Sequence, residues 1–402
     1  MSELSYLEKL LDGTEVVWKT LDDISVKISS GGTPKTGVAE YYDGDIPWLR
    51  TQEVNFCDIW DTGVKITESG VKNSSAKWIP VNCVIIAMYG ATVGKLGINK
   101  IPMTTNQACA NIEVNSEIAD YKYVFYFLSS QYQYIKSLGS GSQTNINAGI
   151  VKKLLVPIPC PDNPEKSLAI QSEIVRILDK FTALTAELTA ELTAELTMRK
   201  KQYNYYRDQL LSFDEGEVEW KMLGDLGENL DSKRKPITSG LREAGSIPYY
   251  GASGIVDYVK DYIFDGDFLL ISEDGANLLA RNTPIAFSIS GKSWVNNHAH
   301  VIKFDSYAER RYVEYYLNSI DLAPYISGAA QPKLNKKNLE SIRIPNPSPE
   351  DKERIVSILD KFDALTNSIN EGLPREIELR QKQYEYYRDL LFSFPRPETA
   401  SN

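Results

Sequence analysis

The stretch KQYNYYRDQLLSF at residues 201–213 decides how this chain is organised, because it recurs as KQYEYYRDLLFSF at residues 382–394. IVRILDKF (174–181) likewise recurs as IVSILDKF (355–362), again 181 positions later. Both repeats keep the same internal spacing, so a whole block of sequence is duplicated rather than a single motif. The chain is therefore predicted to contain two copies of one structural plan.

The duplication continues through the rest of the chain, with small shifts. Similar pairs include EVVWKTL (15–21) with EVEWKML (217–223), and YVFYFLSS (123–130) with YVEYYLNS (312–319). Module 1 (13–158) and module 2 (214–345) carry short β-like runs such as CVIIAMYG and FLLIS, bounded by turn residues. Each module is predicted to be a mixed α+β domain.

The segments that follow the two modules have the periodicity of long helices. From Ser167 to Phe213 there is no Gly or Pro, and apolar residues recur at i, i+3 and i+4. The preceding PDNPEK is a natural helix start. The second region, about 350–394, has the same apolar face but contains Gly372 and Pro374. A break is expected there, with Pro374 opening the next helix.

Three perfect copies of a tetrapeptide, TAELTAELTAEL, occupy residues 185–196. Ala, Glu and Leu are strong helix formers. A leucine every four residues advances by about 40° per repeat around a helix of 3.6 residues per turn, so the leucines follow a slow spiral rather than a straight seam. The repeat is interpreted as a spacer helix packed along one side.

Composition bounds the class of protein. With 402 residues, 42% hydrophobic and 24% charged, the chain is long enough for two to four globular units. The four cysteines form no CxxC pair, which favours a reducing cytoplasm over a disulfide framework or a zinc ribbon. The start resembles no signal peptide, and no apolar run approaches the length of a membrane span.

The net charge of −10 argues against a nucleic-acid partner, so a DNA hypothesis has to answer it. By residue count, module 1 has 13 basic and 13 acidic residues, and module 2 has 15 and 19. Neither module is predicted to carry a broad basic patch. An isolated chain with this balance is expected to bind DNA weakly.

No catalytic motif is present in the sequence. GATVGK (90–95) lacks one residue of a phosphate-binding loop and is followed by Leu96 instead of a hydroxyl, so it is interpreted as a turn. His298 and His300 are expected on one side of a strand, where they could hold a metal in principle, but no third ligand is evident. They are interpreted as a structural pair, and a hydrolase built on them remains an alternative.

The tyrosine-rich segments allow two interpretations. On a helix, Tyr203 and Tyr206 share a face with Leu210, while Tyr205 lies on another. One aromatic face can pack in a core. Aromatic residues all round, together with an arginine, are typical of protein interfaces. The candidate partner-binding residues are Tyr203, Tyr206, Arg207, Tyr384, Tyr387 and Arg388.

Small polar loops occur at equivalent places in the two modules. Module 1 has SSGGTPK (29–35) and QTN (143–145), and module 2 has SKRK (232–235) and QPK (331–333). Gln, Asn, Arg and Lys are the residues that contact base edges and phosphates. Any one loop is more simply a solvated turn, but the recurrence in both modules favours a shared function.

The combination of these elements resembles the DNA-specificity subunits of Type I restriction–modification enzymes over essentially the whole chain. The likeness is carried by SGGTP (30–34), DIPWLR (45–50), GATVGK (90–95), the Ile-Pro runs followed by ILDKF (158–181 and 344–362) and QKQYEYYRDLL (381–391). The tandem TAEL tetrapeptides resemble one subgroup of that family. Together these elements are specific, although none would be so alone.

The resemblance implies a fold and a set of boundaries. The fold would be α+β, with two pseudo-repeated mixed α/β target-recognition domains separated by two long antiparallel, coiled-coil-like helical regions. The expected boundaries are 1–158 for the first target-recognition domain, 159–213 for the central helical spacer, 214–345 for the second domain and 346–402 for the distal helical region and tail.

The resemblance also implies a non-catalytic subunit that reads a bipartite double-stranded DNA site. Two modification subunits would dock on it and methylate adenine N6, and restriction subunits would join through them. S-adenosylmethionine, ATP and magnesium would be bound by those partners and not by this chain. A scaffold with two sugar- or protein-binding modules on a helical spacer remains an alternative.

The side chains expected to contact DNA come from the polar loops and from the motifs that carry the resemblance. They are Ser30, Thr33, Lys35, Arg50, Lys95, Gln143, Thr144 and Asn145 in module 1, and Lys233, Arg234, Lys235, Gln331, Lys333 and Lys336 in module 2.

Overall fold

The computed structural model describes residues 6–139, 145–214, 216–328, 331–367 and 372–395. The chain forms two compact units. Unit 1 consists of Met1–Ala190 and Glu378–Asn402, and unit 2 consists of Glu191–Ile377. Each unit therefore combines one sheet-rich module with parts of both helical regions. Among the described residues, no helix is long and apolar enough to cross a membrane.

Unit 1 contains three sheets. The largest has the strand order β2 (Ser25–Ser30), β10 (Cys109–Val114), β7 (Val84–Ala87), β8 (Leu96–Asn99) and β4 (Cys57–Ile59). A second has the order β5 (Lys65–Ile66), β3 (Tyr42–Leu49), β9 (Met103–Thr105) and β6 (Trp78–Ile79), and β1 (Val16–Thr20) pairs antiparallel with β11 (Leu155–Pro159). The strands β7 and β8 are buried along their whole length, and β7 lies in the apolar run CVIIAMYG that predicted a strand.

Short helices complete unit 1. They are α1 (Tyr6–Leu11), α2 (Glu68–Lys72), α3 (Tyr121–Ser130), α4 (Tyr132–Ser137) and α5 (Ala148–Lys152), with 3-10 turns η1 (Ala39–Tyr41) and η2 (Thr51–Glu53). The side chain of Asp120 caps α3 by accepting from the backbone of Lys122 and Tyr123. Helix α3 buries Tyr123 and Phe127 in the same core as the sheet residues Ile86 and Ile112.

Unit 2 has one large sheet and one strand pair. The sheet has the order β13 (Glu228–Asn229), β18 (Ala299–Lys303), β16 (Phe264–Ser272), β17 (Ala286–Val295), β14 (Ala244–Gly251) and β15 (Gly254–Val259), and β12 (Glu219–Met222) pairs with β19 (Arg343–Asn346). The short helices are α7 (Leu223–Leu226), α8 (Asn277–Ala280), α9 (Tyr307–Ser319) and α10 (Lys336–Glu340), with 3-10 turns η3 (Asp231–Lys233), η4 (Ser239–Leu241) and η5 (Ala323–Tyr325).

The two modules share a topology, which confirms the predicted duplication. The antiparallel order β2-β10-β7-β8 in unit 1 corresponds to β13-β18-β16-β17 in unit 2, and the pair β1-β11 corresponds to β12-β19. Strand β3 runs parallel to β9, as β14 runs parallel to β17. The modules differ where β17 is one strand of 10 residues and unit 1 has the two separate strands β8 and β9.

The predicted long helix is α6 (Pro164–Leu210), with 47 residues and a length of about 70 Å. It begins at Pro164, because proline is tolerated in the first turn of a helix. The second region consists of α11 (Pro349–Asn367) and α12 (Leu373–Leu391), so the expected break is confirmed. Gly372 has φ +80°, and a Cβ there would lie 2.5 Å from the Ala364 carbonyl oxygen, so this turn requires glycine.

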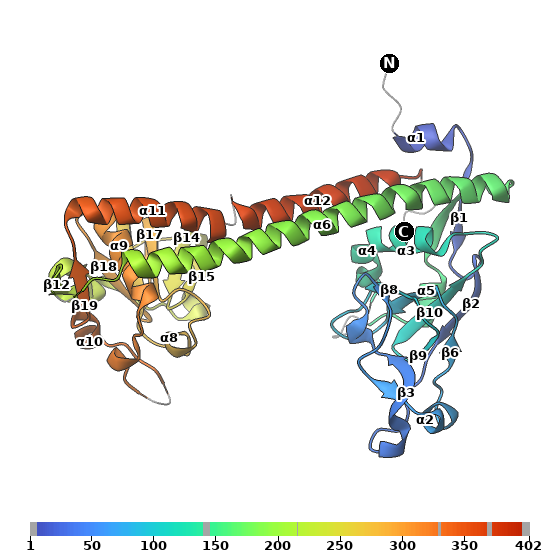
Figure 1. Cartoon of the computed structure of the whole chain (residues 1–402), viewed down its shortest axis with the longest axis horizontal. Helices are drawn as coiled ribbons and strands as arrows, with labels where there is room; N and C mark the ends of the chain where they lie inside the picture. The colour runs from blue at the N-terminus through green and yellow to red at the C-terminus, as the bar shows by residue number, and fades with distance from the viewer. Residues whose placement is uncertain (1–5, 140–144, 215, 329–330, 368–371, 396–402) are drawn as a thin grey trace. The chain divides into compact units, whose positions relative to one another are not determined.

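The two helical regions lie antiparallel within each unit (Figure 1). In unit 1, the Phe181 ring of α6 stacks on the Tyr387 ring of α12, and Thr182 contacts Tyr384. In unit 2, the Tyr206 ring of α6 stacks on the Phe362 ring of α11. Phe181 and Phe362 occupy equivalent places in the repeat, and so do Tyr206 and Tyr387. The two stacked pairs are therefore the same contact made twice with the helices exchanged.

Candidate nucleic-acid and partner interfaces

The first polar loop of module 1 is held tightly and presents three exposed side chains. Strand β2 ends at Ser30, and a Cβ on Gly31 would lie 1.7 Å from the Thr105 carbonyl oxygen, so the loop lies directly on β9. Ser30, Thr33 and Lys35 are exposed, and Thr33 forms a hydrogen bond with Gln107. This loop offers a hydroxyl and an ammonium group on a fixed backbone.

Arg50 and Lys95 lie on two turns that pack against each other. The Thr92 hydroxyl donates to the Thr51 carbonyl oxygen at 2.7 Å, and Lys95 Nζ donates to Asn55 Oδ1 at 2.8 Å. Arg50 Nε lies 3.8 Å from Glu53 Oε2, with about a third of the side chain exposed. The structure thus places both cations in one loop cluster, and the GATVGK segment is a turn, as predicted.

The second polar loop of module 1 is only partly described. Gln143 and Thr144 lie outside the described residues. Asn145 is half-buried, and its Oδ1 is buried with no hydrogen-bond partner among the described residues. A buried amide oxygen without a donor is costly. Asn145 therefore differs in kind from the exposed loop residues with which it was grouped.

The basic loop of module 2 divides into two kinds of side chain. Lys233 and Lys235 are exposed. Arg234 is only 13% exposed, because its guanidinium donates to Glu273 Oε2 at 2.6 Å and to the Ala299 carbonyl oxygen at 2.8 Å. Arg234 is thus committed to the interior of module 2. Contact of Arg234 with DNA remains a prediction, but it would require these bonds to break.

The other basic residues of module 2 are more accessible. Gln331 is exposed. Lys333 is half-exposed, with its Nζ 3.1 Å from Glu273 Oε1. Lys336 at the start of α10 lies 3.5 Å from Glu340 and is also more than half exposed. The Lys336–Glu340 pair is a surface ion pair and therefore weak, so the Lys336 ammonium can exchange its partner for a phosphate at little cost, whereas the partner of Lys333 is the buried Glu273.

The two histidines do not face the same side, which corrects the prediction. His298 lies in the turn before β18 and contacts Asp274 at 2.8 Å, half-exposed. His300 is buried within β18, with Nδ1 2.6 Å from Asp231 Oδ2 and Nε2 2.7 Å from the Leu334 carbonyl oxygen. The expectation assumed one continuous strand, whereas the strand begins only at Ala299.

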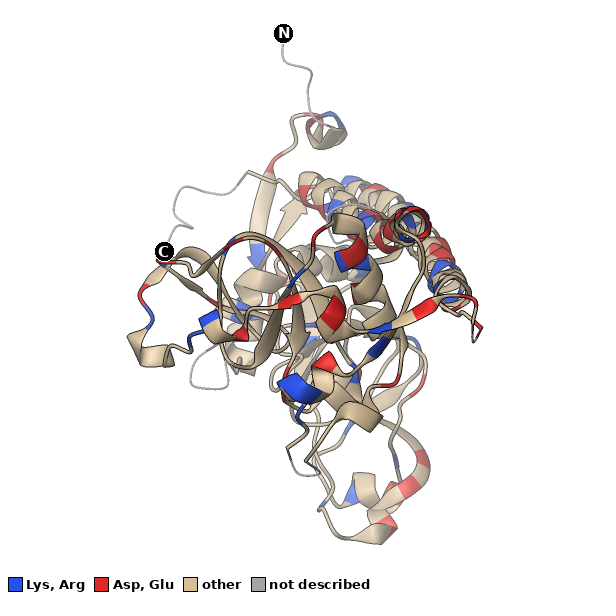
Figure 2. Ribbon diagram, turned by 90° about the vertical axis from the view of Figure 1, so that its left-hand side faces the viewer, with Lys and Arg blue, Asp and Glu red and all other residues tan. Residues whose placement is uncertain are grey.

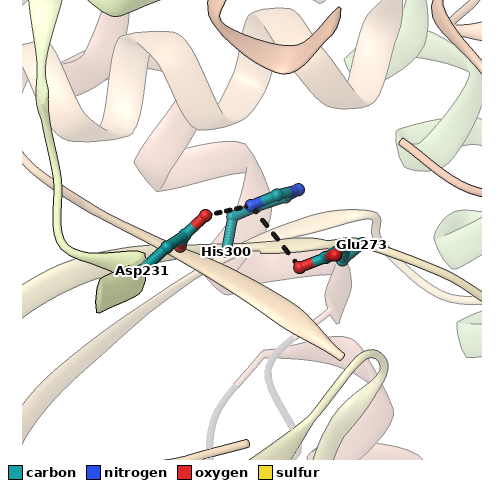
Figure 3. Close-up of side chains that lie close together, drawn as sticks. All are labelled: Asp231, Glu273 and His300. Atoms are coloured by element: carbon teal, nitrogen blue, oxygen red, sulfur yellow. Dashed lines mark hydrogen bonds and ion pairs between the residues drawn. The ribbon is translucent and has the colours of Figure 1, made fainter. Parts of the chain in front are cut away.

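Asp231, Glu273 and His300 lie close enough together to suggest a metal site by residue type (Figure 3). His300 Nδ1 is 3.8 Å from Glu273 Oε2, and both carboxylates also contact the Arg234 guanidinium. Burial alone would raise the pKa of Asp231, but the hydrogen bond and charge of His300 hold that pKa below its usual value. The Arg234 guanidinium already supplies positive charge to both carboxylates, so the cluster does not fit a metal ion.

The tyrosine-rich segments place their predicted partner-binding rings against the opposite helix. Tyr206 and Tyr387 remain about 40% exposed while they stack, and Tyr203 and Tyr384 are more deeply packed. Arg207 lies over the Tyr203 ring. Arg207 and Arg388 each pair with the aspartate that follows, Asp208 and Asp389, at 2.7 and 2.8 Å respectively.

Tyr205 and Tyr386, which the sequence prediction omitted, are the most exposed rings of these segments at 62% each. Each packs edge-to-face on the next tyrosine, with ring centroids 5.4 Å apart in both copies. The helical period already placed Tyr205 on a different face from Tyr203. What the sequence lacked was the direction of the opposite helix, which determines the outward face.

Charge is mixed over the surface, as the residue counts predict. Figure 2 shows basic and acidic positions interspersed along the helices and in the loops. A cleft is present on each unit. One of about 560 Å³ is lined by Asp45, Lys72 and Trp78, and one of about 550 Å³ is lined by Phe213, Glu217 and Arg354, among others.

Known proteins resemble this chain over its full length. The sequence pattern of the Type I restriction modification DNA specificity domain matches residues 14–198 and 215–379. The chain is 41% identical to the EcoR124I/EcoR124II specificity subunit of Escherichia coli over 429 residues, covering 100% of both proteins. It is 42% identical to the EcoprrI specificity subunit of E. coli, covering 92% of this chain and 93% of the relative.

One solved structure supports the fold. A chain from a study of complex assembly and conformational transition in the type I R-M system aligns with a TM-score of 0.63 at 15% identity. The alignment covers 94% of this chain and 97% of the other. At this identity the likeness concerns the fold alone.

Proposed function

The chain belongs to the family of Type I restriction–modification DNA-specificity subunits, and we propose that each of its two modules reads one half of a bipartite double-stranded DNA site. It is a DNA-recognition subunit and not a catalytic one. The alternative scaffold with two sugar- or protein-binding modules is not supported. The observation that carries the proposal is that the family pattern matches twice, once over each module with its helix.

The duplicated topology supports reading in two halves. Two modules with the same strand order offer equivalent loops to a ligand, and a near-repeat of this kind suits a site made of two separated parts. The exposed groups of Thr33, Lys35, Lys233 and Lys235 are of the types that contact phosphates and base edges. We propose that these loops contribute to the DNA surface, with Lys333 and Lys336 beside them.

The partner subunits follow from the repeated tyrosine-rich segments. We propose that two modification subunits dock on them, one for each copy, and methylate adenine N6 with S-adenosylmethionine. Restriction subunits would join through these partners and use ATP and magnesium. The net charge of −10 of this chain supports that division, because the partners would then supply much of the phosphate contact.

The experiment that tests the proposal is methylome mapping of cells that carry this chain with its modification subunit. The expected result is methylated adenine in one motif of two specified parts, separated by a fixed run of unspecified bases. A continuous motif would contradict reading by two modules. Absence of methylation dependent on this chain would contradict the whole proposal.

A further inference from the structure

The junction between module 1 and the long helix includes one carboxylate that accepts two bonds, beside the buried Gln171 of α6, which bonds to the backbone of Ile118 and Asp120. Asp179 of α6 accepts a hydrogen bond from the Tyr126 hydroxyl at 2.7 Å and pairs with Lys122 Nζ at 2.8 Å. Both donors lie on α3, four residues apart, so they are on one face of that helix. The Tyr126 side chain is almost completely buried at 7% exposed.

Module 2 makes the same junction with α11. Asp360 accepts from the Tyr315 hydroxyl at 2.6 Å and from Arg311 Nε at 3.0 Å. These donors lie on α9 and are again four residues apart. A third donor, the Tyr307 hydroxyl, reaches Asp360 at 2.7 Å. Both junctions thus use a cation and a tyrosine on one helix face to hold a single aspartate, and we call them the aspartate joints.

The two joints occupy equivalent positions in the repeated sequence. Asp179 and Asp360 are the same residue of the duplicated ILDKF motif. Two positions further along, Phe181 and Phe362 begin the stacked contact with the opposite helix. Each joint therefore connects a module directly to the part of the helix that packs against the other helical region.

The polar bonds of a joint supply what the apolar contacts beside them cannot. Ile174 and Leu178 are buried in the core of unit 1, as are Ile355 and Leu359 in unit 2, so the helices would adhere to the modules without the aspartates. Apolar burial is non-directional. A hydrogen bond weakens steeply away from its preferred angle. Two donors that meet one carboxylate therefore help to fix how the module is rotated about the helix, together with Gln171 in unit 1 and the Lys352–Glu309 ion pair in unit 2.

We propose that Asp179 and Asp360 are positioning residues that fix the orientation of each module on its helix and so determine which spacer lengths between the two half-sites are accepted. This inference rests on the proposed function. A module of this size is about 30 Å across. A tilt of roughly 7° at the joint would move its far side by about 3.4 Å, the rise of one base pair. A loosened joint would therefore relax the spacer without altering the bases read.

The test is selection of sites from a library of duplexes with varied spacers, using the chain assembled with its modification subunits. Asp179→Ala and Asp360→Ala are each compared with the wild-type chain and with Glu353→Gln, an exposed acidic position on α11. Both alanine variants are expected to accept an additional spacer length with unchanged half-sites. Discrimination against a site one base pair too long should fall by about ten-fold, comparable to loss of one hydrogen bond to a charged group. The glutamine control should match wild type.

Two further variants keep the test decisive if an alanine variant does not fold. Tyr315→Phe removes one donor and keeps the ring. The double variant that combines Lys122→Asp with Asp179→Lys reverses the charges of the pair, and it should keep the narrow spacer preference that either change alone relaxes. Unchanged spacer preference in Tyr315→Phe and in both alanine variants would overturn the inference, as would a change in half-site sequence. If the wild-type complex selects no two-part site, the proposed function fails instead.

Discussion

The aspartate joint of unit 2 is more extensively bonded than that of unit 1, although the two are equivalent in the repeat. Arg311 is 13% exposed and contacts Glu314 and Asp363 as well as Asp360. Lys122 is 32% exposed and contacts Asp179, itself 40% exposed. Duplication has therefore kept the position of the contact while burial and the number of partners changed. The stability of the two units should therefore respond differently to equivalent substitutions.

The largest expected effect comes from shortening α6, the helix that runs through both units. Deletion of one TAEL tetrapeptide removes four residues, or about 6 Å of helix, compared with 3.4 Å for one base pair. We expect the preferred spacer to shorten by one or two base pairs and the original site to be lost, while both half-site sequences stay the same. Site selection with the assembled complex measures this, and an unchanged spacer would refute the hypothesis that the number of TAEL repeats sets the spacer length.

Removal of the cation from each joint tests the difference in burial. Arg311→Ala leaves Glu314 buried without its cation, and burial already raises the pKa of that carboxyl. We expect a loss of about 3–5 kcal/mol in the free energy of unfolding of unit 2. Lys122→Ala should cost about 1 kcal/mol or less in unit 1, since its pair is exposed to solvent. Urea denaturation measures both, and equal losses would mean that burial does not distinguish the joints.

The exposed rings should respond equally in the two copies, because their geometry is the same. Tyr205→Ala and Tyr386→Ala are each expected to weaken binding of one modification subunit by about 1–2 kcal/mol, or roughly ten-fold. The double variant should lose both copies, and Tyr134→Ala, an exposed ring on α4, serves as the control. Native mass spectrometry of the complex reports the stoichiometry. Full two-copy assembly of the double variant would place the docking surface elsewhere.

The smallest expected effect is acid sensitivity of module 2. Burial alone would raise the pKa of Asp231 and Glu273, but bonds from His300 and Arg234 respectively hold both below their usual values. Each group therefore stabilises the fold above its unfolded pKa near 4, and this contribution is lost as the pH falls through the lower folded pKa. Asp231→Asn should lose less stability than wild type between pH 6 and pH 3. Equal losses in urea denaturation would remove this network as the cause.

The sequence predicted features that depend on regular spacing along the chain. The long helix, its start signal in PDNPEK and the break before Pro374 follow from local rules for periodicity and proline. The double module follows from repeats at a constant separation. These properties need no knowledge of which segments meet in space.

The remaining features depend on contacts between distant segments. Arg234 was assigned to an exposed loop. Its partner Glu273 follows β16 and its partner Ala299 begins β18, and no local sequence pattern connects either strand to Arg234. Tyr205 was left out of the partner surface because the outward face depends on where the second helix packs. Each aspartate joint was present in the repeats, yet pairing Asp179 with Lys122 and Tyr126 required the fold.

The central claim is that the two modules read separate halves of one site. Alanine variants in the polar loop of one module at a time test this claim most directly. The wild-type complex, a Thr33→Ala and Lys35→Ala double variant, and a Lys233→Ala and Lys235→Ala double variant would each select sites from a fully randomised duplex library. We predict that the first double variant degrades one half of the selected motif and the second degrades the other, with the spacer unchanged. If both variants altered the same half, or if each altered both halves, the account would be contradicted.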